Sequence, residues 1–283
     1  MPELPEVETV VRGLRAVLPG RRILGVRLGK TDFIKDPAAI ERDLPGSRIG
    51  GVRRHGKFLV IELETPGESA RNSSLLIHLG MTGQIITCPS DAPAAPHTHA
   101  FLALNDSLDL RYIDIRRFGS IQMLSEAARE SALGELGLDA LDATEKEFIA
   151  QLQDRRARIK ALLLDQRVLR GMGNIYTDES LFRARLHPAR IAANLKTDEL
   201  RRLYRAVQQV LTEAIRMRGS SISDYVDSEG LPGGFQVRHR VYQRKGKKCL
   251  RCGALIQRAI VAGRSSYFCP GCQPAPRVRK AGR

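Results

Sequence analysis

Apolar residues recur at helical spacing close to the start of the chain. Pro5 suits a first helical turn, Glu6 and Glu8 complement the positive end of a helix, and Pro19-Gly20 would stop it. The positions that would share the apolar face are Val7, Val10, Val11, Leu14, Val17 and Leu18. This pattern predicts an N-terminal amphipathic helix.

Further along, apolar and polar positions alternate with a period of two. Turn residues separate these segments, which cover residues 22–28, 48–63, 74–87, 100–104 and 108–124. Such alternation is typical of half-buried strands, and a run of strands of this kind favours antiparallel sheets. We therefore expect an antiparallel β-sandwich, in which residues 89–96 form a surface loop.

The pattern becomes helical again from about residue 131. Gly171-Met172-Gly173 breaks the chain, and Asn174 is a suitable cap for a helix over residues 175–186. Thr197 is expected to cap a longer helix. Residues 219–240 are rich in Gly and Ser and predict a long loop, a feature that is usually functional or disordered.

The length and the changes in pattern suggest several folded parts. A chain of 283 residues with 42% hydrophobic and 27% charged residues is typical of a soluble protein with two domains and a small appendage. We expect domains over residues 1–130, 131–236 and 237–273, followed by a basic disordered tail at 274–283. Because the sequence has no long apolar run and its first residues are acidic, we expect a cytosolic protein with no membrane partner.

The charge is strongly positive. Lys and Arg number 46 against 31 Asp and Glu, which gives a net charge of +15. Solubility alone needs about 2–8 units on a small domain, so an excess this large favours a polyanionic partner, most commonly nucleic acid. General solubilising charge is the alternative.

Cysteines near the C-terminus have the spacing of a metal site. Cys249 and Cys252 form one CxxC pair, Cys269 and Cys272 form another, and sixteen residues separate the pairs. Four thiolates are the ligand set of one structural Zn²⁺, and such a closed site leaves no position for a substrate. A redox-active CxxC is the alternative. Cys88 stands apart and is given no role.

Between the two pairs, residues 254–261 and 265–268 predict a β-hairpin, with Arg264 at its turn beside Gly263. An arginine at a hairpin tip is commonly just solvated. In a basic protein it can also reach a phosphate. The spacing leaves both interpretations open.

The N-terminus offers unusual chemistry. Met1 precedes a small residue, so its removal would leave Pro2 with a free secondary amine, and α-amino groups titrate near pH 8. Attack of that amine on a sugar aldehyde carbon gives a cationic iminium ion, and Glu3 beside it could move protons. Taken alone, these two residues would more simply lead into a capped helix.

Further motifs follow in a fixed order. They are PELPEVETV at the N-terminus, the lysine in RHGKFL (54–59), HLGMTG (78–83), DIRRFG (114–119), GNIYTDESLF (173–182) and the four-cysteine hairpin. Together they resemble the formamidopyrimidine-DNA glycosylase family, bacterial enzymes that repair 8-oxoguanine, from residue 2 to about 273. The resemblance implies an α+β multidomain fold: an N-terminal helix with an antiparallel β-sandwich, a helix-two-turns-helix domain and a zinc β-hairpin.

The resemblance also implies base-excision repair. The enzyme would flip out an oxidised purine, remove it through a Schiff base and nick the strand by β,δ-elimination. By matching positions, Pro2 would be the nucleophile and Glu3 the acid/base, with support from Glu6. Lys57 would assist β-elimination, and Arg264 on the zinc hairpin would grip phosphates and assist δ-elimination.

Seven other positions match DNA contacts of the family. Met81, Arg116 and Phe118 would fill the gap left by the flipped base, although strand spacing alone would make Met81 and Phe118 core residues. The remaining matches are His78, His97, Arg155 and Asn174. Three positions depart from the family pattern and bear on DNA contact and loop geometry, namely Thr98, Ile115 and Arg170.

Two alternatives belong beside this hypothesis. An endonuclease VIII-like enzyme for oxidised pyrimidines shares the fold, but its terminus usually reads PEGPE where this chain has Leu4. A non-catalytic zinc-ribbon protein would explain the charge and the cysteines but not Pro2, Glu3 and Lys57 together. We expect a monomer with one Zn²⁺ and damaged double-stranded DNA as its partner.

Overall fold

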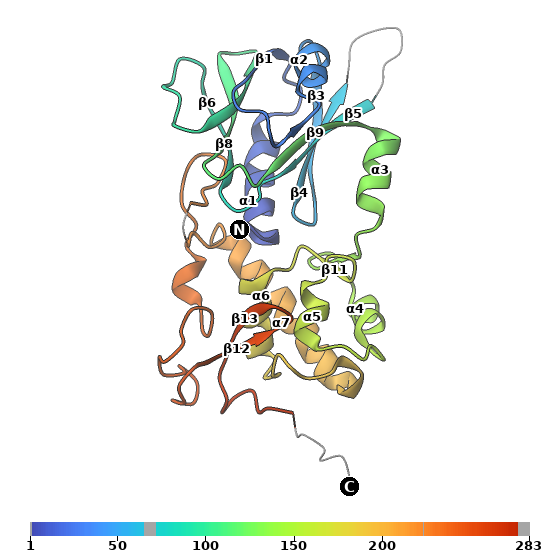
Figure 1. Ribbon diagram of the computed structural model, residues 1–283, viewed down its shortest axis with the longest axis vertical. Coiled ribbons are helices and arrows are strands. Elements are labelled where there is room, and N and C mark those ends of the chain that lie inside the picture. The colour runs from blue at the N-terminus through green and yellow to red at the C-terminus, as the bar shows by residue number, and fades with distance from the viewer. Residues whose placement is uncertain (1, 65–71, 223, 277–283) are drawn as a thin grey trace. The chain divides into compact units, whose positions relative to one another are not determined.

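The computed structural model describes residues 2–64, 72–222 and 224–276. The chain forms two compact units (Figure 1). The first runs up to residue 135 and includes 214–236, and the second covers 136–213 and the chain from 237. Met1 and most of the predicted basic tail lie outside the described residues. The predicted domain boundaries stay a prediction.

The first unit is a β-sandwich with helices. Its helices are α1 (Leu4–Val17), α2 (Pro37–Asp43) and α3 (Glu126–Gly134). Its strands are β1 (Ile23–Leu28), β2 (Ile34–Lys35), β3 (Arg48–His55), β4 (Phe58–Glu64), β5 (Asn72–His78), β6 (Gly83–Pro89), β7 (Thr98–Leu104), β8 (Leu108–Asp114) and β9 (Ser120–Ser125). One sheet has the order β1-β7-β8-β6 and the other β2-β9-β5-β4-β3, antiparallel except for the short β2–β9 pair. The predicted sandwich is confirmed.

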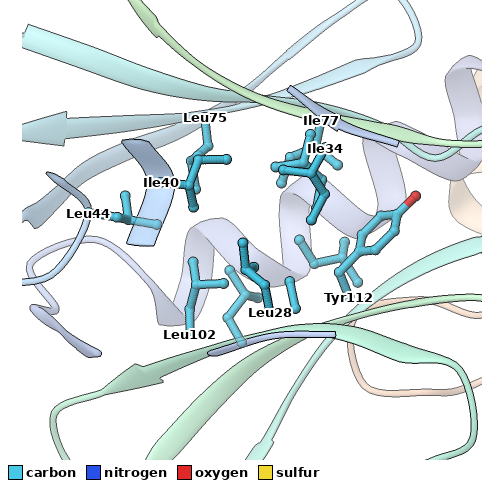
Figure 2. A pocket seen from close by; sticks show the side chains of 12 residues that line it. Leu28, Ile34, Ile40, Leu44, Leu75, Ile77, Leu102 and Tyr112 are labelled. Carbon is cyan, nitrogen blue, oxygen red and sulfur yellow. The ribbon is translucent and has the colours of Figure 1, made fainter. Parts of the chain in front are cut away.

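The sandwich core accounts for the alternation in the sequence. Figure 2 shows Leu75 and Ile77 of β5 on one side and Leu102 and Tyr112 of the other sheet facing them, with Ile40 of α2 among them. They surround a cavity of about 20 Å³ whose lining is wholly apolar. A dry apolar space of this size is a packing gap and not a ligand site.

Helix α1 buries the face that the sequence predicts. Val7, Val10, Val11 and Leu14 are at most 1% exposed. The helix packs against β3 and β4, so its N-terminus is held at a fixed place in the first unit. The predicted N-terminal helix is therefore confirmed.

The second unit is mainly helical. Its elements are β10 (Leu138–Asp139), α4 (Glu145–Leu152), α5 (Ile159–Leu164), β11 (Leu169–Arg170), α6 (Asn174–Arg183), the 3-10 turn η1 (Ala192–Asn194), α7 (Thr197–Arg216), and the hairpin of β12 (Gln257–Val261) and β13 (Arg264–Phe268). A second 3-10 turn, η2 (Phe235–Arg238), and the last residues of α7 extend into the first unit. Within the described ranges, every helix is too short or too polar to cross a membrane.

Several local predictions were wrong in detail. Gly173 is the N-cap of α6 and Asn174 is its first residue, and the Asn174 side chain donates to the Ser265 carbonyl of the zinc hairpin. Thr197 likewise begins α7 rather than preceding it. Arg264 opens strand β13, and the turn before it consists of Ala262 and Gly263, both with positive φ.

Candidate functional site

The N-terminal residues of the first unit are buried and held by one carboxylate. Pro2 is buried, and Glu3 is 3% exposed at the cap of α1. The Glu3 backbone N–H donates to Glu6 Oε2 at 2.8 Å, and the Ser220 backbone N–H donates to Glu6 Oε1 at 2.7 Å. Gly219 has a φ of +75°, and a Cβ there would lie 2.6 Å from Glu6 Oε1. Glu6 thus joins the N-terminus to the segment at 219–220. Its close approach leaves no room for a side chain at Gly219.

A second set of hydrogen bonds fixes the turn that carries Lys57. This lysine lies between β3 and β4 and is 8% exposed. Arg54 Nε donates to Glu8 Oε2 of α1 at 2.9 Å, and Arg54 Nη1 donates to the Gly56 carbonyl at 3.3 Å. The side chains of Arg54 and Glu8 are almost buried, so solvent screens this contact little. The turn with Lys57 is therefore tied to the helix that begins beside Pro2.

His78 lies at the end of β5, in register with Phe58, the residue after Lys57. Burial, together with the Lys57 charge, lowers the pKa of His78 to about 4. Its Nδ1 accepts a hydrogen bond from the Gly80 backbone N–H at 3.1 Å. A neutral imidazole that accepts at Nδ1 carries its proton on Nε2. His78 is therefore a neutral donor at physiological pH, suited to a phosphate oxygen.

The three gap-filling candidates come together on the surface of the first unit. Met81 is 39% exposed and Phe118 57% exposed. The interpretation of these two as core residues is therefore wrong. The Arg116 guanidinium lies over the Phe118 ring, 4.4 Å from its centroid. Gly80 allows the two segments to meet, because a Cβ there would lie 2.3 Å from the Phe118 carbonyl carbon.

A buried aspartate organises these segments. Asp114 is 0% exposed. Its Oδ1 accepts from Thr82 Oγ1 at 2.5 Å and from the Arg116 N–H at 3.2 Å, and its Oδ2 accepts from the Gly119 N–H at 2.9 Å. Sequence reasoning missed this role, although Asp114 opens the DIRRFG motif.

An exposed ion pair also holds this loop. Arg117 donates to both carboxylate oxygens of Asp32 at 2.7 Å while its own φ is +55°. Nothing in the local sequence pointed to Asp32, because its partner lies 85 residues away.

The remaining matched positions are accessible. His97 is exposed in the first unit and Arg155 in the second. The three positions that depart from the family pattern have the following surroundings. Thr98 Oγ1 donates to the Ala95 carbonyl, Arg170 Nη1 donates to the Gly137 carbonyl, and the Ile115 side chain is 49% exposed.

In the second unit, strand β13 is docked onto α5 and α6. Lys160 Nζ donates to Asp178 Oδ1 at 2.7 Å and to the Ser265 carbonyl at 2.9 Å. Asn174 Nδ2 donates to the same carbonyl at 3.0 Å, and the Tyr267 N–H donates to Asp178 Oδ2 at 2.8 Å. Burial raises the pKa of Asp178 to about 7 against the opposing effect of Lys160. Sequence reasoning missed this network.

The four cysteines of the second unit fit one zinc ion. Their sulfur atoms lie within 4.8 Å of one another, with Cys249–Cys272 at 3.9 Å and Cys252–Cys269 at 3.3 Å. A tetrahedral Zn–S site with bonds of about 2.3 Å places its sulfurs about 3.8 Å apart. The backbone N–H of Arg251 points at the sulfur of Cys249 at 3.4 Å, which suits a thiolate. Because four protein ligands complete a tetrahedron, this metal is structural.

Three family models match the chain in sequence order. The formamidopyrimidine-DNA glycosylase N-terminal domain matches residues 1–121, and the H2TH domain of the same enzymes matches residues 136–226. A zinc finger found in FPG and IleRS matches residues 246–275.

Relatives match over nearly their full length. Formamidopyrimidine-DNA glycosylases of Solibacter usitatus and Pelotomaculum thermopropionicum are 46% and 43% identical, each over 96% of this chain and 99% of the relative. A Lactococcus lactis Fpg complex with abasic-site DNA has a TM-score of 0.87 at 33% identity, covering 96% of this chain and 100% of that one. Another, with oxidised-pyrimidine DNA, has a TM-score of 0.85 at 33% identity, covering 97% and 100%. The chain belongs to the formamidopyrimidine-DNA glycosylase family.

Proposed function

We propose that this chain excises oxidised purines from damaged double-stranded DNA and then cuts the strand at the resulting site. One observation carries this function: a buried N-terminal Pro2-Glu3 pair whose helix is clamped, through Glu8 and Arg54, to the turn that carries Lys57. A non-catalytic DNA-binding protein has no need of such an arrangement. The family membership and the net charge of +15 support the same assignment.

The first half of the reaction uses the amine of Pro2. Its lone pair forms a bond to C1′ of the damaged nucleotide, and the base leaves with the electrons of the glycosidic bond and takes up a proton. The C1′–O4′ bond then breaks, O4′ is protonated, and the nitrogen becomes part of an iminium ion. Glu3, the next residue in the chain, delivers and removes these protons.

The second half uses the iminium ion as an electron sink. Loss of a proton from C2′ expels the 3′-phosphate from C3′, which is the β-elimination that Lys57 assists. Loss of a proton from C4′ expels the 5′-phosphate from C5′, which is the δ-elimination that Arg264 assists. His78 and Asn174 hold phosphates during both steps, and charge-assisted contacts of Lys57 and Arg264 strengthen that hold.

Met81, Arg116 and Phe118 make the flipped state accessible. Extrusion of a base costs roughly a few kcal/mol of stacking and pairing. Two apolar side chains that enter the stack offset part of that cost. Arg116 meets the orphaned partner base, where it can donate hydrogen bonds. His97 and Arg155 add contacts to the DNA backbone.

The zinc ion supplies no reaction step. When bound, it holds the hairpin of β12 and β13 in its folded form, which a two-stranded hairpin of this size does not maintain by itself in water. A nucleophile and a hairpin in one chain suffice for a monomeric enzyme. Because its substrate is genomic DNA, we place the protein in the bacterial cytosol, at the nucleoid.

Borohydride trapping tests the proposal. Reduction of the iminium ion by borohydride links the enzyme covalently to DNA, so the processed protein is expected to form an adduct with a duplex that contains oxidised guanine. A matched variant with one Ser inserted before Pro2, with Met1 removed, buries its proline nitrogen in an amide bond. It should bind the duplex and form no adduct at Pro2.

An adduct from the Ser-extended variant equal to that of the processed protein, and mapped to an internal lysine rather than to the new Ser amine, would move the nucleophile to that lysine. The absence of any adduct from correctly processed protein would refute the enzyme hypothesis. The same trapping test should include duplexes with an oxidised pyrimidine, because a relative has been crystallised with one. A preference for those over oxidised purines would favour the endonuclease VIII-like alternative.

A further inference from the structure

A buried ion pair in the second unit serves the zinc hairpin. Lys160 is 0% exposed and Asp178 is 1% exposed, and their side chains meet at 2.7 Å. A pair buried this deeply is weak evidence for stability, because removing two charges from water offsets the attraction between them. Specific placement of a neighbouring group is therefore a better explanation for the pair than stability.

The neighbouring group is the outer edge of strand β13. Among the described residues, this strand pairs with β12 on one side only, in a two-stranded sheet. On the other side, the Ser265 carbonyl and the Tyr267 N–H are two residues apart and meet Lys160 and Asp178. Residues two apart on a strand direct their backbone groups to the same edge. The ion pair thus takes the place of a third strand.

Arg264 immediately precedes the carbonyl that is held. Ser265 O accepts from Lys160 Nζ at 2.9 Å and from Asn174 Nδ2 at 3.0 Å. Arg264 itself is exposed, at the end of a turn whose two residues have positive φ. How firmly the next peptide group is fixed therefore determines how precisely the Arg264 side chain is directed.

We propose that Lys160 and Asp178 are positioning residues for Arg264, which fix the peptide groups that follow it and thereby aim its guanidinium. The inference rests on the proposed function, since it assigns the pair to the δ-elimination step. Displacements of about 1 Å are enough to cost a reaction on the order of a hundredfold in rate. A loosened β13 would therefore affect the step that uses Arg264 more than the step that uses Lys57.

The test replaces both charges at once. A single substitution would leave a buried charge without its partner and risk unfolding, whereas an apolar pair of similar volume is often tolerated. The variant is Lys160→Met with Asp178→Leu, studied as full-length zinc-loaded protein. Zinc content, measured first, is expected to match the parent, and one cooperative thermal transition is expected at a lower midpoint, because the Ser265 carbonyl and the Tyr267 N–H each lose a buried partner.

Two quantities are then measured. One is the set of products formed from an abasic-site duplex, and the other is the amide exchange of strand β13. The ratio of δ- to β-elimination product is expected to fall on the order of tenfold, while the rate of β-elimination stays within about threefold. Amide hydrogen exchange at residues 265–268 is expected to accelerate on the order of tenfold, because the Tyr267 N–H loses its acceptor.

A matched control removes another ion pair of the same unit. Arg190 contacts Glu199 at 2.9 Å, and its guanidinium is otherwise bonded to the Asn194 carbonyl. Arg190→Met with Glu199→Leu should leave both the product ratio and the exchange at 265–268 unchanged. Arg264→Ala supplies the reference ratio for a lost guanidinium.

The outcomes are distinguishable. If Arg264→Ala lowers the ratio and the Lys160/Asp178 variant does not, the positioning inference is overturned and the proposed function stands. Unchanged exchange at 265–268 in that variant would overturn it as well. If Arg264→Ala itself leaves the ratio unchanged, the assigned role of Arg264 and the inference built on it both fail.

Discussion

Two neighbouring basic side chains of the first unit differ in charge. His78 lies beside Lys57, and that charge, added to burial, keeps the imidazole neutral by lowering its pKa to about 4. A fixed neutral donor can contact a phosphate without competing with the lysine for protons. In the proposed function, Lys57 thus supplies the charged contact to phosphate and His78 supplies a neutral hydrogen bond.

The first prediction concerns the protonation of His78. Its ¹⁵N resonances should show a neutral ring with the proton on Nε2 down to about pH 4, whereas a histidine in a short reference peptide titrates near 6.5. Because the unfolded chain takes up this proton first, the free energy of unfolding should decrease by about 2–3 kcal/mol from this group as the pH falls from 6.5 towards 4. Titration of His78 near 6.5 would contradict the prediction.

A second prediction concerns Met81 and Phe118. Since both side chains are exposed, Met81→Ala and Phe118→Ala should change the free energy of unfolding by at most about 0.5 kcal/mol. Single-turnover excision should slow on the order of tenfold for Phe118→Ala, because stacking of an aromatic ring on a base contributes about 1–3 kcal/mol. Met81→Ala should also slow it, because an apolar wedge between base steps is lost. Leu24→Ala, at a position 60% exposed on β1, is the control and should keep the parent rate. Equal rates in all three variants would remove the two residues from the gap-filling role.

At the scale of elements, periodic patterns in the sequence predicted the helices and strands that depend on neighbouring residues alone. The apolar face of α1 and the alternation along β4 to β8 required no distant information. The contact of the Asn174 amide with Ser265 was missed because that partner is 91 residues away. Asp32 and the Lys160–Asp178 pair were missed for the same reason. Their partners are fixed by the fold, and no period in the sequence encodes them. Asp114 was missed although two of its partners, Arg116 and Gly119, lie within five residues of it.

A third prediction belongs to the zinc hairpin. Cys249→Ser removes one of four ligands, so the hairpin should lose its metal and unfold, and duplex binding should weaken by at least about tenfold. Zinc content and binding to an abasic-site duplex check this together. Cys88→Ser, at a cysteine remote from this cluster in the sequence, should retain both. Full binding by the zinc-free variant would show that the hairpin is dispensable.

At the scale of the whole molecule, the positive charge is spread over both units. Lys57 and Arg116 belong to the first, and Arg155 and Arg264 to the second. The charge of +15 therefore acts as a general attraction for DNA that does not depend on the lesion. In the proposed function, recognition of damage comes from the gap-filling candidates and from the chemistry at Pro2.

The fourth prediction separates these two contributions. Duplex affinity should fall by about 10³–10⁵ between 50 and 200 mM salt if roughly 6–10 phosphates are contacted. The preference for a lesion-containing duplex over an undamaged one should change far less over the same range. Fluorescence anisotropy with both duplexes measures the two quantities. A preference that disappears together with the affinity would assign lesion recognition to electrostatics as well.

The bond between Glu6 and Ser220 joins residues that the ribosome makes far apart in time. Ser220 follows Glu6 by 214 positions, so at a synthesis rate of about 5–20 residues per second roughly 10–40 s pass before Ser220 exists. During that interval the nascent amino terminus cannot adopt its final buried state. We expect methionine removal to take place within this window, so that the fold closes over an end that has already matured.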